Sequence, residues 1–149
     1  MRRLPVAVLT GLVIAALLPA APAAANAQRD AIDQLNKIRV AHGLSALRAS
    51  RSLHQSSTRY ARHIVSSGYF GHMSRIAVSS GFRRAGETLE MHSGWQPDPG
   101  LAIQGWMNSA THRAVLLSSQ FKWVGMGIAK GRNANGDYTV WVAHVGAKR

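Results

Sequence analysis

Apolar side chains recur at helical spacing in the first half of the chain. The first such stretch covers residues 30–42 and is followed by Gly43, a residue type that commonly ends a helix. The second and longest begins after Ser50, a suitable N-cap, and continues to Gly68. Residues 76–82 carry a weaker pattern that predicts a short helical turn.

The second half changes from a helical period to strict alternation. Asp98 can cap a helix with Pro99 in its first position, and the pattern predicts a helix over residues 99–109. Residues 121–130 and 137–146 then alternate around turn residues, which is typical of two antiparallel strands joined by a hairpin. Helices first and strands last indicate an α+β layered domain rather than repeated βαβ units.

The N-terminal segment has the character of a secretory signal. Two arginines precede an apolar run over residues 4–18, and small residues end in an A-x-A site at Ala27. We expect a signal peptide over residues 1–27 and a single domain over residues 28–149, secreted or held at the cell envelope. The apolar run is short for a membrane span, and an uncleaved anchor is the alternative.

Charge and cysteine content narrow the classes of chemistry. The chain has no cysteine, which excludes thiolate metal sites and cysteine nucleophiles, and which in an exported domain favours a bacterial source. The net charge is +12, or +10 after the two N-terminal arginines are removed, so anionic surfaces are expected partners. No basic stripe in the sequence is interleaved with aromatic residues, so specific nucleic-acid binding is not indicated.

A few polar residues have no evident structural role in the sequence. Glu87 and Glu90 are acidic residues that neither cap a helix nor occupy a turn. His72 and His112 follow aromatic or apolar residues where elements end, and His144 shares a strand face with valines. Each of these histidines, taken alone, is better explained as a satisfied or exposed side chain than as a metal ligand.

Four motifs in order resemble those of the CAP superfamily, which comprises cysteine-rich secretory, antigen 5 and pathogenesis-related 1 proteins. They are YFGH after the long helix, GE before a strand, the WMNSATHR block and the VGMG strand. The resemblance extends over about residues 31–146 and points to a bacterial, extracellular SCP-like member. It implies an α–β–α sandwich with a small antiparallel sheet between helices.

The resemblance also implies a cleft of two histidines and two acids that holds a divalent metal in some members. By motif, His72 and His112 match the histidines and would be the zinc ligands, and Glu87 matches the first acid. Ser109 occupies the place of the second acid, which weakens a site for zinc or another divalent ion. Thr88 stands where the family usually has asparagine. The alternative to a metal site is a hydrogen-bonded polar network of the same residues.

Three functions remain open at this point. The resemblance favours a secreted, non-catalytic module that binds a lipid, a sterol or a cell-envelope component. A metal-assisted hydrolase would use Glu87 as the general base on a metal-bound water. A cationic envelope-associated protein would act through its charge alone. No other catalytic residue is assigned, and the sequence does not determine the ligand or the oligomeric state.

Overall fold

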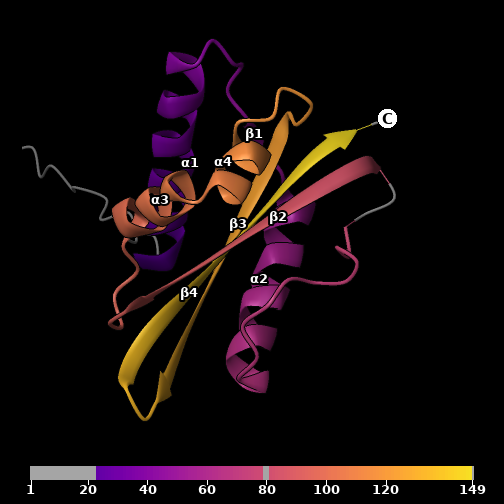
Figure 1. Cartoon of the computed structure of the whole chain (residues 1–149). Helices are drawn as coiled ribbons and strands as arrows, with labels where there is room; N and C mark the ends of the chain where they lie inside the picture. Colours follow the sequence, from indigo (N-terminus) through magenta and orange to yellow (C-terminus); the bar gives the residue numbers. More distant parts are fainter. Residues whose placement is uncertain (1–22, 79–80, 149) are drawn as a thin grey trace, which may run out of the picture.

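The computed structural model describes residues 23–78 and 81–148, which form three layers (Figure 1). A four-stranded sheet lies between helix α2 on one face and three helices on the other. The helices are α1 (Ala23–Ala41), α2 (Arg51–Ser67), α3 (Pro99–Asn108) and α4 (Ala110–Leu116). The architecture confirms the α–β–α sandwich and the α+β class.

The sheet has the strand order β1-β3-β4-β2. Its strands are β1 (Arg48–Ala49), β2 (Phe82–Ser93), β3 (Trp123–Asn133) and β4 (Gly136–Lys148). The long strands pair antiparallel, as expected, and β3 and β4 form the predicted hairpin. The two-residue β1 pairs parallel with β3 and was not predicted. Both of its residues are exposed, so it has no hydrophobic pattern.

Alternation along β4 divides the core into two clusters. Trp141 and Val145 pack with α1, α3 and α4 on one face of the sheet, where Trp106 is fully buried. Val140 and Val142 pack on the opposite face against α2. Successive strand residues point to opposite faces, so His144 is directed toward α2 with Val142.

Two glycines of β3 let α2 approach the sheet closely. A Cβ atom on Gly125 would lie 2.0 Å from the backbone nitrogen of His54, and one on Gly127 would lie 2.3 Å from the backbone of Ser57. Any larger side chain would therefore push α2 away from the sheet.

Local signals at the helix ends are confirmed. The side chain of Ser50 accepts a hydrogen bond from the backbone N–H of Leu53, and Gly68 ends α2 with a φ of 69°. Asp98 caps α3 in the same way, and Pro99 is in the first turn. These bonds satisfy helix-terminal groups that would otherwise be unpaired.

Other boundaries predicted from the sequence are wrong. Helix α1 begins at Ala23 rather than near residue 30, because Ala27, Ala31 and Leu35 continue one buried face at a spacing of four. The expected helical turn over residues 76–82 is absent from its described part, and Phe82 instead opens β2.

The predicted signal segment lies outside the described residues except for residues 23–27, which belong to α1. The cleavage after Ala27 therefore stays a prediction. Within residues 23–78 and 81–148, no helix is both long and apolar enough to span a membrane.

A buried arginine fixes the position of α4. The guanidinium of Arg39 on α1 is fully buried and donates to the backbone carbonyls of Leu116 and Ser118 at the end of that helix and just after it. It also donates to the carbonyl of Ser45. A buried charge requires such partners, so this contact holds the helix that carries His112 against α1.

Candidate functional site

Glu87 points toward α2 because its neighbour Gly86 faces α4. A Cβ atom on Gly86 would lie 2.8 Å from a methyl carbon of Val115 on α4, so the position excludes a side chain. The next residue along the strand projects from the opposite face, where it lies directly across from His144 on β4. Gly86 therefore allows α4 to pack against the sheet, and Glu87 places its carboxylate on the opposite face, toward α2.

Both carboxylate oxygens of Glu87 are engaged. His144 donates from Nε2 to Oε2 over 2.9 Å, and His72 donates from Nδ1 to Oε1 over 3.0 Å. The backbone N–H of Met73 donates to the same Oε1 over 3.0 Å. The side chain of Glu87 is only 3% exposed, so these three donors replace the water it has lost.

Ser56 of α2 completes the network on its buried side. Its Oγ lies 2.7 Å from Nδ1 of His144 and donates to the carbonyl of Leu53 within the helix. His144 is fully buried and has a hydrogen-bond partner at each ring nitrogen. Close packing of α2 on Gly125 brings Ser56 within reach, because Gly125 is the residue of β3 paired with His144.

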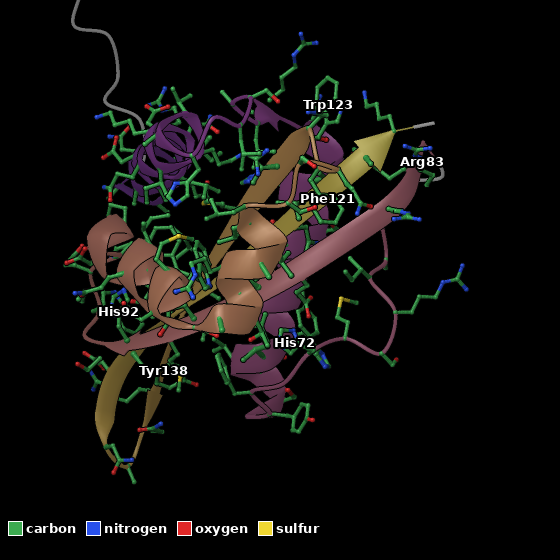
Figure 2. All side chains as sticks on the ribbon, turned by 45° about the horizontal axis from the view of Figure 1, so that its top comes forward. His72, Arg83, His92, Phe121, Trp123 and Tyr138 are labelled. Atoms are coloured by element: carbon green, nitrogen blue, oxygen red, sulfur yellow. The ribbon has the colours of Figure 1, made fainter. Side chains whose placement is uncertain are left out.

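The opposite side of Glu87 is open and less completely bonded. His72 lies on the segment that returns from α2 past β2 (Figure 2), and its side chain is 55% exposed. His112 on α4 approaches it edge-on, with ring centroids 5.8 Å apart and planes inclined by 62°. Nδ1 of His112 is buried without a hydrogen-bond partner among the described residues. The structure thus brings His72, Glu87 and His112 together.

Ser109 is a helix cap between α3 and α4. It ends α3, and its side chain accepts a hydrogen bond from the backbone N–H of His112 at the start of α4. Its Oγ also lies 3.1 Å from Oγ1 of Thr111. The hydroxyl therefore has a structural role in this chain at the position where the resemblance implies an acid.

The local environment moves two pKa values in the cluster. Burial raises the pKa of Glu87, but hydrogen bonds from His144, Met73 and His72 outweigh it and hold the pKa below its ordinary value. Burial lowers the pKa of His112, and the nearby charge of His72 lowers it further. The arrangement favours an ionised carboxylate and a neutral His112 ring.

Two residues of this network were not assigned from the sequence. His144 was noted on a strand face without a direction, and Ser56 was not singled out. His144 lies 57 residues from Glu87, and Ser56 lies 88 residues from His144. The alternation in β4 placed His144 on the face of Val142, but only the register with β2 sets it opposite Glu87.

Thr88 occupies the position where the resemblance implies an asparagine. The residue is fully buried on the α4 side of β2, and its Oγ1 has no hydrogen-bond partner among the described residues. The indole nitrogen of Trp106 on α3 is also buried without one in the part of the chain that the structure describes. Buried polar groups of this kind cost stability unless water reaches them.

A cavity of about 430 Å³ adjoins the network. It lies between α2 and the segment of residues 69–77. Its lining combines aromatic and sulfur-containing side chains with arginines and histidines, namely Tyr60, Tyr69, Met73, Arg59, Arg75, His63 and His72. Tyr69 and the adjacent Phe70 are large apolar side chains left 65% and 44% exposed. The cavity is therefore amphiphilic, with exposed aromatic residues at its edge.

The donors in the cleft fit a zinc site poorly. Glu87 already accepts three hydrogen bonds, so it orients His72 in the way an outer-sphere carboxylate does rather than offering a free oxygen. Nε2 of His72 and the His112 ring remain as two candidate ligands, whereas catalytic zinc sites use three. The described residues hold no group of three or more His, Cys, Asp or Glu arranged to bind a metal.

Known structures share this fold. An outer surface protein from Borrelia burgdorferi superposes with a TM-score of 0.69 at 14% identity, covering 83% of this chain and 94% of that chain. An extracellular SCP-domain protein from Bacillus anthracis strain Ames gives a TM-score of 0.66 at 25% identity, covering 83% and 41%. The first likeness, at such low identity, shows the fold alone.

Sequence comparison identifies the family. Over 112 residues the chain is 28% identical to "Uncharacterized membrane protein YlbC" of Bacillus subtilis (strain 168), covering 69% of this chain. It spans only 32% of that relative's length. The model of the cysteine-rich secretory protein family, CAP, matches residues 32–145, which is most of the chain. The chain therefore belongs to the CAP family.

Proposed function

We propose that this CAP domain is a secreted, non-catalytic module that binds an amphiphilic lipid or a related cell-envelope component. The observation that carries the proposal is the amphiphilic cavity between α2 and residues 69–77. Its volume of about 430 Å³ lies within the range of about 300–1,000 Å³ typical of small-molecule sites. The extracellular SCP-domain protein of Bacillus anthracis supports a location outside the cell.

The chemistry of the lining favours a ligand with an anionic head and an apolar body. Arg59 and Arg75 lie on the rim as exposed cations, whereas Tyr60 and Met73 lie deeper. Tyr60 is held in place because its hydroxyl donates to the carbonyl of Gly71. A fatty acid or an anionic lipid satisfies both regions, whereas a sterol has no charge for the arginines.

The state of Glu87 supports binding over hydrolysis. A general base must be free to take a proton from water. Glu87 instead accepts three hydrogen bonds, is nearly inaccessible and has a lowered pKa, all of which make it a weak base. The hydrolase hypothesis would need this network to open.

Binding of oleate, measured by isothermal calorimetry, tests the proposal. We expect Arg59→Gln to weaken binding about tenfold, the effect of losing one charge-assisted hydrogen bond of roughly 1.4 kcal/mol. Arg62→Gln is the matched control, because Arg62 is also exposed on α2 but does not line the cavity. Equal affinity in both variants, or no binding of oleate by the wild type, would contradict the proposal.

Zinc binding at His72 and His112 is the alternative that one observation favours. Nδ1 of His112 is buried without a partner among the described residues, and its ring is held neutral, as a metal ligand must be. If zinc binds, its affinity falls from about pH 7.5 to about 5.5, across the usual histidine range, and alanine at either histidine abolishes it. Calorimetry with zinc alone decides, because binding that survives loss of both histidines places the metal elsewhere.

Secretion is tested at the N-terminus of the exported protein. The A-x-A site predicts that the mature chain begins at Gln28. N-terminal sequencing that found Met1 retained would contradict cleavage and favour the uncleaved anchor.

A further inference from the structure

Cationic and aromatic side chains alternate across one end of the sheet. In strand order they are Arg48 on β1, Trp123 on β3, Lys148 on β4 and Phe82 on β2, which we call the sheet-end row. Pairing places Arg48 beside Trp123, and Phe82 beside Lys148. Trp123 and Arg83, which follows Phe82, are seen at this same end of the sheet in Figure 2.

The cations of the row are held by the aromatic rings. Nζ of Lys148 lies 3.9 Å from the ring centroid of Trp123 and 5.9 Å from that of Phe82. The guanidinium of Arg48 also lies over Trp123, with its central carbon 5.8 Å from the ring centroid. Cation–π contacts fix the positions of these charges without neutralising them. Trp123 itself is half-buried.

The charge at this end has no acidic counterpart among the described residues. Arg83, Arg84 and Lys122 add three exposed cations beside the row. Arg84 donates to Gln120 and Lys122 to Ser45, which are neutral partners. In residues 23–78 and 81–148, the ion pairs join only Glu87 to two histidines and Asp137 to Arg132.

The two charges of the row lie close to each other. The guanidinium of Arg48 and the ammonium of Lys148 both lie over the ring of Trp123, 5.8 Å and 3.9 Å from its centroid, so they are no more than about 10 Å apart. That separation is close to the screening length of about 8–10 Å at physiological salt, so the charges still repel one another. A chain of anions that crosses the strands would relieve this repulsion at each cation in turn.

We propose that the sheet-end row binds a linear phosphate polyester of the cell envelope. No residue of the row lines the amphiphilic cavity, and the proposal goes beyond the lipid-binding function proposed above. The row would bind successive phosphates through Arg48 and Lys148, with Arg83 and Arg84 extending it along β2.

Other anionic partners fit the row less well. Lys148 covers the ring of Trp123, so bases of a nucleic acid cannot stack there as they do in single-strand binding proteins. Phe82 is buried and Trp123 half-buried, so no large apolar side chain of the row is free to enter a bilayer. The exposed aromatic pair, Tyr69 and Phe70, belongs to the edge of the cavity instead.

Binding of inorganic polyphosphate at several salt concentrations tests the proposal. We expect Arg48→Gln/Lys148→Gln to lose about tenfold in affinity at about 0.15 M salt. The plot of log affinity against log salt has a negative slope, and its magnitude should decrease by roughly 1.4, because each phosphate contact to a single strand contributes about 0.7. Lys37→Gln/Arg62→Gln removes the same charge from exposed positions on α1 and α2 and should change both quantities much less.

The outcomes separate this surface from general charge and from other partners. Equal losses in the two double variants would show that net charge alone binds and would overturn the proposal. Thymidine oligomers that bind at least tenfold tighter than polyphosphate of equal phosphate number would assign the row to nucleic acid. Dependence on Arg48 and Lys148 seen only with phosphatidylglycerol vesicles would assign it to membranes. Unfolding midpoints of all variants verify that each is folded, and oleate binding should be unchanged.

Discussion

The two halves of the cleft differ in how completely their polar atoms are bonded. The inner half consists of Glu87, His144 and Ser56, where every carboxylate oxygen and ring nitrogen has a partner and the histidine is fully buried. The outer half consists of His72, His112 and Ser109. There one ring is largely exposed, another has a buried nitrogen without a partner among the described residues, and the hydroxyl is used as a helix cap.

The difference indicates that one carboxylate serves two purposes. Toward β4 and α2 it forms a closed network that joins the sheet to a helix, which is a structural role. Toward the segment after α2 it orients His72, whose other ring nitrogen remains available to a ligand. Stability should therefore depend on the inner half, and binding at the cleft on the outer half.

The largest effect is expected when the inner half is broken. His144→Ala leaves Oε2 of Glu87 as a buried charge without its donor and should lower the free energy of unfolding by about 3–5 kcal/mol. His72→Ala is the matched change in the outer half and should cost about 1 kcal/mol or less, because the ring is exposed. Urea unfolding measures both free energies, and equal losses in the two variants would contradict the difference between the inner and outer halves. If the alanine variant does not fold, His144→Gln can be measured in its place, because its side-chain amide can still donate a hydrogen bond.

A second change separates α2 from the inner half. Gly125→Ala brings a methyl group against the backbone of α2 at His54, so the helix must shift and Ser56 must move from His144. We expect a loss of about 1–3 kcal/mol in unfolding free energy. Gly100→Ala, within helix α3 and near only a side-chain oxygen of Asp98, should change stability by about 1 kcal/mol or less. Similar losses in both variants would show that α2 has room to adjust.

Ser109 tests the outer half. Ser109→Ala removes the cap of α4 and should cost about 1 kcal/mol, while any zinc affinity stays nearly unchanged. Ser109→Asp keeps a capping oxygen and adds a carboxylate at the place of the second acid, so zinc affinity should rise at unchanged stability. Urea unfolding and zinc calorimetry measure the two effects. A strong loss of zinc binding in the alanine variant would make Ser109 a ligand rather than a cap.

The smallest effect is a pH dependence in two separate steps. The pKa of folded His112 is lowered, so as pH falls below about 6.5 the unfolded chain takes up a proton first and stability decreases. The pKa of folded Glu87 is also lowered, so its contribution is present above about 4.5 and is lost as pH falls through the folded value. His112→Gln should weaken only the upper step in urea midpoints measured from about pH 7.5 down to about pH 3, where the Glu87 step lies below about 4.5. An unchanged upper step would assign it to another histidine.

Much of the fold could be predicted because its signals are local. Ser50 and Asp98 mark helix starts by accepting a hydrogen bond from the residue three positions later, and Pro99 marks one through its fixed φ. The missed elements had weak local signals. Helix α4 is only seven residues long and begins directly after the cap of α3, so no separate helix was predicted beyond residue 109.

The sequence by itself determined the order of the motifs, the alternation that directs His144 to one face of β4, and the excess of positive charge. Tertiary structure alone decided which of these residues meet. The register of β2 on β4 sets His144 against Glu87, and the glycines of β3 bring Ser56 to the same ring. The sheet-end row likewise combines residues from all four strands, although no such row exists along the chain. The reason is physical: a helix cap depends on neighbours in sequence, whereas these contacts depend on how distant segments pack.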